Sequence, residues 1–279
     1  MNPTFFDVNE SSRTMSFTIE ILPALSNNYT FLLSDPDLGL ATVIDPSDGP
    51  QVATALKKRD LYLALILNTH HHPDHTGGNE FLQQEFGAPV IGPLEEKNLI
   101  PGISRGVTRN DIITFSTLRG QVLPTHGHTD GHISFYFPQI KALFSGDVLF
   151  PLGCGRLIEG NSAQMWESLI LIRNLPDDTL IYASHELAEE NVSFALSVDK
   201  KNFELQKRAA TLLAQRKAGK PSVPMILGDE KRFNPFLRPD NADFRKVLAT
   251  AGIAPEDADP AAVFGLLRSA KDHFGQNGL

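Results

Sequence analysis

The sequence predicts an α/β domain followed by a smaller helical domain. From residue 17 to about residue 182, short runs rich in branched and aromatic residues alternate with segments of helical periodicity. After His185 strand patterns are nearly absent, while helical periodicity continues towards the end of the chain. With 279 residues and 41% apolar content, the chain can bury the core that such an architecture needs. We therefore expect an N-terminal extension over residues 1–16, an α/β domain over 17–190 and a helical domain over 191–279.

Two periodicities predict the individual elements. Short apolar runs predict strands at Phe17–Leu22, Tyr29–Leu33, Ala41–Asp45, Leu61–Asn68, Gln121–Leu123, Ile133–Phe137, Lys141–Ser145 and Thr179–Ala183. Apolar residues at helical spacing predict helices at Gln51–Arg59, Gly77–Phe86, Ala163–Arg173, Glu189–Asp199, Asn202–Ala218, Asp243–Ala251 and Ala261–Lys271. Ser162 is the expected N-cap of the third helix, and Pro221 and Pro224 interrupt the chain after the fifth.

Composition argues against several classes of protein. The net charge of −8 disfavours general nucleic-acid binding, although residues 200–250 hold 12 Lys and Arg against 5 Asp and Glu. Apolar runs are far shorter than the roughly 20 residues that span a bilayer, and residues 1–16 lack the apolar segment of a secretory signal. The single cysteine, Cys154, cannot form a disulfide framework. We expect a cytoplasmic protein with no membrane or nucleic-acid partner, and a monomer by default.

The densest group of chemically active side chains lies at residues 69–75, which read Thr-His-His-His-Pro-Asp-His. Four of the nine histidines of the chain fall within it, so chance clustering explains it poorly. The run directly follows the apolar strand predicted at Leu61–Asn68. Histidine and aspartate bind divalent metals through nitrogen and oxygen, and loops that leave buried strands present binding residues on a rigid scaffold. The pattern therefore predicts a metal site.

Three later segments place further candidate ligands at the ends of predicted strands. His128 lies in a glycine-rich turn between two strands, Asp147 follows the strand that ends at Ser145, and His185 follows the strand that ends at Ala183. Strand ends of this kind can meet at one edge of a sheet. The order and spacing of these residues strengthen the prediction of a metal site.

The motif His-x-His-x-Asp-His, followed by a distant His, Asp and His, resembles the metallo-β-lactamase superfamily over about residues 17–185. The resemblance implies an αββα sandwich that holds two metal ions. By motif position, the first metal site would comprise His70, His72 and His128, the second would comprise Asp74, His75 and His185, and Asp147 would bridge the two.

Two divalent ions would carry more positive charge than the two carboxylates return, so a water between them should ionise readily. A single Zn²⁺ already lowers the pKa of a bound water from about 16 to about 7. The bridging hydroxide can attack a carbonyl directly, so no serine or cysteine nucleophile is needed. Asp74 can orient this hydroxide and Asp147 joins the ions, so we expect both to be catalytic. The ligand set suits zinc first, with iron or manganese as alternatives.

Three further matches resemble glyoxalase II, the hydroxyacylglutathione hydrolases. They are Thr-His-His-His-x-Asp-His-Thr-Gly-Gly-Asn at residues 69–79, Gly-Cys-Gly-Arg at 153–156 and Asn-Pro-Phe-Leu-Arg at 234–238. With them the resemblance covers about residues 17–250. It implies hydrolysis of the thioester S-D-lactoylglutathione to glutathione and D-lactate, the second step of methylglyoxal detoxification. The helical domain would then help to bind the substrate.

The resemblance also implies how the thiol carrier is held. Arg156 and Arg238 stand where the family places basic residues, and a guanidinium group pairs well with a carboxylate. The alternative for both is an ion pair between domains. The chain departs from the family at Pro73, where relatives have Trp, and at Ile158 and Leu187, where relatives have tyrosines that hold glutathione. Relatives that use trypanothione, a polyamine-bearing bis-glutathione, also lack these tyrosines, so both thiol carriers remain open.

Other activities on the same fold fit the sequence less well. A mononuclear-iron persulfide dioxygenase would use only the first site and leave Asp74, His75 and His185 partly unused. A nuclease would need a clamp domain or a basic arm, and a β-lactam hydrolase would need an export signal; the sequence shows neither pattern. A non-catalytic zinc protein would be expected to have lost a ligand, whereas all seven are retained.

Overall fold

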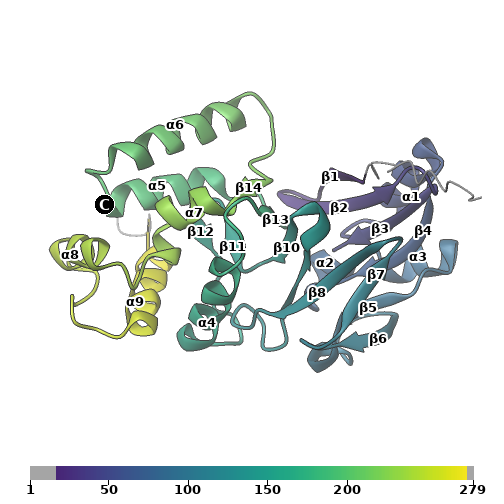
Figure 1. The fold of residues 1–279 in the computed structure, drawn as a ribbon, viewed down its shortest axis with the longest axis horizontal. Coiled ribbons are helices and arrows are strands. Elements are labelled where there is room, and N and C mark those ends of the chain that lie inside the picture. Colours follow the sequence, from purple (N-terminus) through teal and green to yellow (C-terminus); the bar gives the residue numbers. More distant parts are fainter. Residues whose placement is uncertain (1–16, 275–279) are drawn as a thin grey trace, which may run out of the picture.

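The computed structural model describes residues 17–274, so the extension expected over residues 1–16 lies outside the described residues. Two six-stranded sheets pack against each other (Figure 1). Helices α1 (Gly49–Arg59) and α3 (Asn79–Phe86) cover the outer face of the first sheet, and the C-terminal helices gather at the other end of the molecule. The predicted αββα sandwich with C-terminal helices is confirmed.

The strands follow one another in each sheet in a defined spatial order. The first sheet contains β1 (Thr18–Ala24), β2 (Asn28–Asp35), β3 (Leu40–Ile44), β4 (Tyr62–Leu67), β5 (Val90–Pro93) and β6 (Ile103–Val107). The second contains β14 (Met225–Ile226), β13 (Leu180–Ala183), β10 (Ala142–Gly146), β9 (Ile133–Phe137), β8 (Leu118–Pro124) and β7 (Ile112–Phe115). A short ribbon pairs β11 (Leu149–Phe150) with β12 (Gly153–Cys154).

The remaining helices lie in the loops of the sandwich and in the C-terminal region. They are α2 (Pro73–Thr76), α4 (Ser162–Arg173), α5 (Ala188–Val198), α6 (Phe203–Lys217), α7 (Leu227–Phe233), α8 (Ala242–Thr250) and α9 (Pro260–Asp272). Single 3₁₀ turns occur at η1 (Leu94–Glu96), η2 (Pro138–Ile140) and η3 (Pro235–Leu237).

The eight predicted strands and seven predicted helices are all present, with their ends shifted by a few residues. The prediction of Ser162 as a helix cap is wrong, because the N-cap of α4 is Asn161. The Asn161 side chain accepts hydrogen bonds from the backbone N–H groups of Ala163 and Gln164. The Gln164 side chain accepts one from the Asn161 backbone N–H, which completes a capping box. The sequence interpretation missed α7, the ribbon β11–β12 and strands β5, β6, β7 and β14. Strand β14 lies where no strand was expected, and it pairs with β13.

The core between the sheets explains why the central strands are continuous apolar runs. Strands β2, β9 and β10 are buried at every position. Phe31 of the first sheet meets Phe144 and Tyr182 of the second, with ring centroids 5.6 and 5.5 Å apart. A strand that is covered on both faces need not alternate between apolar and polar residues.

The sheet topology brings polar strand ends together. Strand β3 is parallel to β4, and β10 is parallel to β13, so within each sheet the carboxyl ends of these strands lie at the same edge. A residue pair bridges the two sheets there, since Asn28 at the start of β2 pairs with His185 just after β13. Candidate ligands follow β4, β10 and β13 within a few residues. This edge is therefore where the sequence-predicted site must form.

Two buried side chains tie the C-terminal helices to the ribbon β11–β12. Glu230 of α7 is fully buried and accepts a hydrogen bond from the backbone N–H of Leu152 at 2.8 Å. The Asn234 side chain donates to the carbonyl oxygens of Phe150 and Gly153, at 3.1 and 2.9 Å. Burial raises the pKa of Glu230 to about 7, although the Leu152 N–H, Arg208 and the Asn234 amide, which also donates to Glu230, oppose the shift. The ribbon that follows Asp147 is thus held from the helical side.

The raised pKa of Glu230 predicts that one component of stability falls as pH rises. From its ordinary value of 4.5 to about 7, the folded chain holds the Glu230 proton more tightly than the unfolded chain does. The free energy of unfolding therefore decreases across that interval, by about 3 kcal/mol at about 1.36 kcal/mol per pKa unit. The Glu230→Gln variant lacks this component. Urea unfolding of the metal-free proteins from about pH 4.5 to about pH 8 measures the difference, and a pH-independent difference would contradict the assignment.

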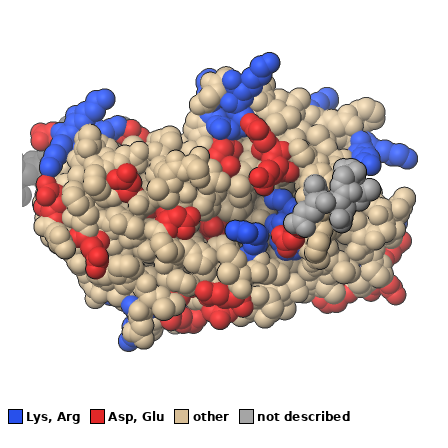
Figure 2. Space-filling view, turned by 180° about the vertical axis from the view of Figure 1, so that it is seen from behind, with Lys and Arg blue, Asp and Glu red and all other residues tan. Residues whose placement is uncertain are grey.

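The basic residues of segment 200–250 do not form one continuous positive surface in the described part of the chain. On the face in Figure 2, Lys and Arg form small separate patches between acidic side chains. Several of these basic residues pair with acids, among them Lys207 with Glu204 and Arg216 with Glu186. Within residues 17–274, no helix combines the length and apolar character needed to cross a bilayer.

Candidate metal centre

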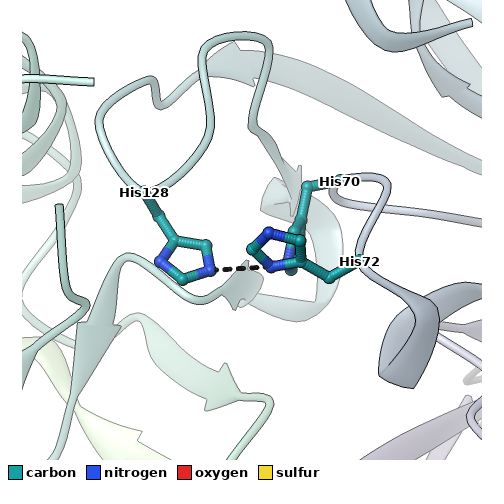
Figure 3. A group of neighbouring side chains, drawn as sticks. All are labelled: His70, His72 and His128. Atoms are coloured by element: carbon teal, nitrogen blue, oxygen red, sulfur yellow. Dashed lines mark hydrogen bonds between the residues drawn. The ribbon is translucent and has the colours of Figure 1, made fainter. Parts of the chain in front are cut away.

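The loop after β4 and the β8–β9 turn bring together the three-histidine group, His70, His72 and His128. The His72 Nδ1 atom lies 3.0 Å from His70 Nε2 and 3.1 Å from His128 Nε2 (Figure 3). The donor atoms of all three residues lie within 4.8 Å of one another. Three converging imidazole nitrogens are a ligand set that suits zinc and other divalent transition metals.

A second cluster lies next to the first and comprises Asp74, His75 and His185, here called the mixed group. The Asp74 Oδ2 atom lies 3.6 Å from His75 Nε2 and 3.5 Å from His185 Nε2. Asp147 stands between the two groups. Its Oδ2 atom is 3.3 Å from His128 Nε2 and 3.2 Å from His185 Nε2, and its Oδ1 atom is 3.5 Å from His75 Nε2. The structure thus brings all seven sequence-predicted ligands into one cluster.

The protonation of these side chains suits metal binding in the three-histidine group. Burial, together with the neighbouring histidines, holds the pKa of His70 well below its usual range, which leaves a neutral imidazole. Burial also opposes ionisation of Asp147, but His75 and His185 outweigh it and hold the pKa of this carboxyl far below its usual range. Neutral imidazole and ionised carboxylate are the forms that bind a metal ion.

His75 differs, because three carboxylates surround it. Burial lowers the pKa of His75, but Asp147, Asp45 and Asp74 outweigh that effect and raise it to about 9. A metal ion that binds His75 must therefore displace a proton. Asp147 Oδ1 supplies a separate test of fit: it is buried, and among the described residues it accepts no hydrogen bond. A buried carboxylate oxygen with no hydrogen bond is costly, and a cation in the cluster would satisfy it better than His75 does at 3.5 Å.

Neighbouring side chains fix the orientation of the ligands. The Asp45 carboxylate accepts a hydrogen bond from the Thr69 backbone N–H at 2.8 Å and lies 3.1 Å from His75 Nδ1. The Asn28 side chain donates to Asp74 Oδ2 at 2.9 Å, and His128 Nδ1 lies 3.0 Å from the Arg156 carbonyl oxygen. Holding one ring nitrogen turns the other towards the cluster, as is usual for metal-binding histidines.

A cavity of about 470 Å³ opens beside the cluster between the two halves of the molecule. His128, Asp147 and His185 form part of its wall. Another part holds three cationic residues, Arg156, Arg268 and Lys271, together with the acidic Glu190 and Asp272. The cavity therefore places three cationic side chains near the candidate metal ligands, although Asp272 already pairs with Arg268. A carboxylate of a substrate could be held there.

Sequence reasoning missed Arg268 and Lys271 of helix α9. Arg268 is buried, and it donates to the Cys154 carbonyl oxygen at 2.8 Å and to Asp272 at 2.9 Å. Burial and the nearby Arg268 lower the pKa of Lys271 to about 8. The spacing Arg-x-x-Lys places both residues on one face of a helix. This spacing is the feature of the sequence that could have indicated that both line one site.

Arg156 lines this cavity as expected, but Arg238 does not. The Arg238 guanidinium group pairs with Asp199 at 2.9 Å and lies 4.2 Å from the ring centre of Phe244. It lines a separate cavity whose wall holds none of the candidate ligands. In this structure Arg238 therefore forms the alternative that was considered for it, an ion pair, at a distance from the candidate ligands. Asp199 follows α5, so this pair joins segments within the C-terminal region instead of two domains.

Comparisons with known proteins agree with this geometry. Residues 24–185 match the family model described as the metallo-beta-lactamase superfamily, and residues 186–274 match the one described as hydroxyacylglutathione hydrolase C-terminus. The hydroxyacylglutathione hydrolase of Rhodospirillum rubrum is 44% identical over 256 residues, which cover 92% of this chain and 98% of that protein. The chain belongs to the hydroxyacylglutathione hydrolase family. The resemblance inferred from its motifs is thus confirmed.

Other relatives of this hydroxyacylglutathione hydrolase family member extend the comparison. The hydroxyacylglutathione hydrolase of Maricaulis maris is 43% identical, with 92% of this chain and 98% of that protein covered. Among solved structures, ETHE1 from Myxococcus xanthus has a TM-score of 0.63 at 25% identity, over 92% of this chain and 91% of that chain. TTHA1623 in a di-iron-bound form has a TM-score of 0.51 at 28% identity, over 60% of this chain and 91% of that chain. The fold is therefore shared with a protein that holds paired metal ions.

Proposed function

We propose that this chain hydrolyses the thioester of S-D-lactoylglutathione to glutathione and D-lactate, and so acts in methylglyoxal detoxification. One observation carries the proposal: a cavity that holds Arg156, Arg268 and Lys271 opens onto the cluster of candidate ligands at His128, Asp147 and His185. A thioester of glutathione needs both, because its carbonyl must be activated and its carboxylates must be bound. Relatives named hydroxyacylglutathione hydrolase match the chain over more than nine-tenths of its length.

The proposed metal centre holds two divalent ions, zinc in the first instance and iron or manganese as alternatives. The three-histidine group would hold one ion and the mixed group the other, with Asp147 shared. Bound there, the ions supply Lewis acidity and lower the pKa of water. The di-iron form of TTHA1623 supports keeping iron among the candidates.

The side chains of the chain itself account for the remaining steps. Burial raises the pKa of Asp74, but His75 and Asn28 outweigh it and lower the pKa overall, so its carboxylate stays available to orient the attacking water. Arg156, Arg268 and Lys271 would bind the carboxylates of the glutathione part, and the departing thiolate would leave towards the same cations. Glutathione is favoured over trypanothione because the relatives that cover most of the chain are named hydroxyacylglutathione hydrolase.

The domain roles follow from the same arrangement. We propose a catalytic domain over residues 17–190 and a helical substrate-binding domain over 191–279, since Arg268 and Lys271 reach the cavity from α9. A cytoplasmic location agrees with the free, buried Cys154, and we propose a monomer by default.

The experiment that tests the proposal is a thioester assay on protein of known metal content. Zinc-loaded protein should hydrolyse S-D-lactoylglutathione, seen as loss of thioester absorbance and release of free thiol, and a chelator should abolish the activity. Trypanothione thioesters and a β-lactam serve as comparison substrates. Fully loaded protein that leaves S-D-lactoylglutathione intact would overturn the proposal.

A substitution at Lys271 separates substrate binding from chemistry. Lys271→Met keeps the length of the side chain and removes its charge. We expect KM to rise about tenfold or more with little change in kcat, because a hydrogen bond to a charged group is worth about 1.5–3 kcal/mol and Lys271 lies away from the reacting carbonyl. Lys246→Met, at an exposed position in α8, is the matched control. An unchanged KM for Lys271→Met would remove this residue from the binding site.

A further inference from the structure

A buried glutamate, Glu96, lies between the two loops that carry the three-histidine group. Glu96 ends the turn η1 after strand β5 and is only 3% exposed, which is unusual for a charged residue. Its Oε2 atom accepts a hydrogen bond from the His71 backbone N–H at 2.7 Å and lies 2.9 Å from His71 Nδ1. Its Oε1 atom accepts hydrogen bonds from the Thr129 hydroxyl and from the Gly131 backbone N–H. One carboxylate is thus bonded to both loops.

The partners of Glu96 are immediate neighbours of metal ligands. His71 stands between His70 and His72, and Thr129 directly follows His128. One oxygen of the carboxylate therefore fixes the first loop, and the other oxygen fixes the second. The separation between the loops sets how closely the His72 and His128 nitrogens approach. Hydrogen bonds to an ionised carboxylate are roughly twice as strong as neutral ones, so this link resists movement of either loop.

Two independent features show that this contact is built into both loops. A Cβ atom at Gly131 would lie 2.6 Å from Glu96 Cγ, so the approach of the second loop requires glycine at this position. A second carboxylate spans the same loops nearer the surface. Glu159 lies 3.3 Å from His71 Nε2 and accepts a hydrogen bond from the Asp130 backbone N–H at 2.9 Å. Both ring nitrogens of His71 therefore face carboxylates, which fixes its ring beside that of His72, with ring centroids 4.9 Å apart.

The mixed group does not depend on these contacts. Asp74 is held by Asn28, and His75 is held by Asp45, neither of which touches Glu96 in the described part of the chain. Loss of Glu96 should therefore act on one group of ligands and leave the other in place. A residue that only stabilised the fold would affect both groups alike.

We propose that Glu96 is a positioning residue for the three-histidine group, setting the distance between the His70–His72 loop and the His128 loop and hence the affinity of that group for a divalent ion. The inference rests on the metal centre of the proposed function but not on the identity of the substrate. It adds a residue that contacts neither metal nor substrate and acts only through the backbone and side chains next to the ligands.

The test measures zinc affinity directly, by competition with a chromophoric chelator. Glu96→Gln keeps the shape of the side chain but replaces one carboxylate oxygen by an NH₂ group. That group would face the hydrogen-bond donors of either His71 or the Thr129–Gly131 loop, so one set of hydrogen bonds would be lost. We expect one of the two zinc dissociation constants to rise about 10- to 100-fold, as found when outer partners of metal ligands are removed, while the other changes little. Glu95→Gln, at the exposed neighbouring position in η1, should bind zinc like the wild type.

Two further measurements keep the test decisive. If Glu96→Gln does not fold, Thr129→Val offers a milder change, because it removes one hydrogen bond to the Glu96 carboxylate and leaves the charge of the site unchanged. It should raise the same zinc dissociation constant by a smaller factor. With zinc at saturation, both variants should keep the wild-type KM. Wild-type zinc affinity in Glu96→Gln, or an equal loss at both sites, overturns the inference. Failure of the wild type to bind two ions would instead overturn the proposed function.

Discussion

Replacement of His72 by Ala is expected to abolish nearly all thioester hydrolysis while the fold is kept. The variant loses the nitrogen that stands 3.0 Å from His70 Nε2 and 3.1 Å from His128 Nε2, so the three-histidine group keeps only two ligands. We expect kcat to fall by at least about 10³-fold, the scale seen when a preorganised electrostatic group is removed from an active site. His72 is partly exposed, so its truncation leaves no large internal void. Steady-state kinetics, elemental analysis and thermal unfolding measure the three effects.

The matched control for His72→Ala is the same change at His126. His126 lies in the loop of His128, but its side chain faces a different cavity, which Arg109 and Glu167 also line. The His126→Ala variant should therefore retain two zinc ions and an unchanged kcat. Full activity in His72→Ala, or equal losses in both variants, would contradict the assignment of the three-histidine group.

The second large effect is expected from Gly155→Ala, which should destabilise the chain and disrupt the site together. A Cβ atom at position 155 would lie 1.8 Å from the Asp147 carbonyl oxygen, so the backbone of one segment must move. No rotation of a side chain can relieve a clash with a carbonyl oxygen. We expect a loss of about 3 kcal/mol or more in the free energy of unfolding, at the upper end of the cost of overpacking. Because Asp147 and Arg156 flank the clash, kcat should fall and KM should rise.

Gly252→Ala supplies the comparison for this second variant. Gly252 has a φ of +69°, and a Cβ atom added there would have no neighbour within 4 Å. Alanine at this position therefore costs only the strain of a left-handed backbone, about 1–2 kcal/mol. Its kinetic constants should stay at wild-type values. A Gly155→Ala variant as stable and active as Gly252→Ala would show that the Asp147 loop can shift freely. Urea unfolding and steady-state kinetics on both variants decide between these outcomes.

The seven candidate ligands could be found from the sequence because each lies close to the end of a strand with a clear pattern or in a turn between two such strands. His70 follows the apolar run of β4, and Asp147 follows that of β10. Parallel pairing aligns the strand ends within each sheet, and the packing of the two sheets then brings both sets of ends together. The αββα class could be predicted for the same reason, since its central strands are buried on both faces.

Other features depend on contacts that no local pattern contains. Strand β6 reads Ile-Ser-Arg-Gly-Val and forms because β5 lies beside it, not because its own residues favour a strand. Arg238 belongs to a motif that predicts substrate contact, yet its guanidinium group forms an ion pair with Asp199. Arg268 and Lys271 are ordinary basic residues of an amphipathic helix until α9 packs against the segment of Cys154. Which charge faces substrate and which faces a partner is decided by tertiary packing.

The spread of the ligands along the chain has a consequence for biosynthesis. His70 emerges from the ribosome long before His185, and α9, with two of the cavity's cations, emerges last. A nascent chain can offer only the first histidine cluster to a divalent metal ion, with none of the surrounding partners in place. The seven candidate ligands can therefore meet only after His185 has been made and the two sheets have closed. Metal binding at the complete centre is thus a late event in the maturation of this chain.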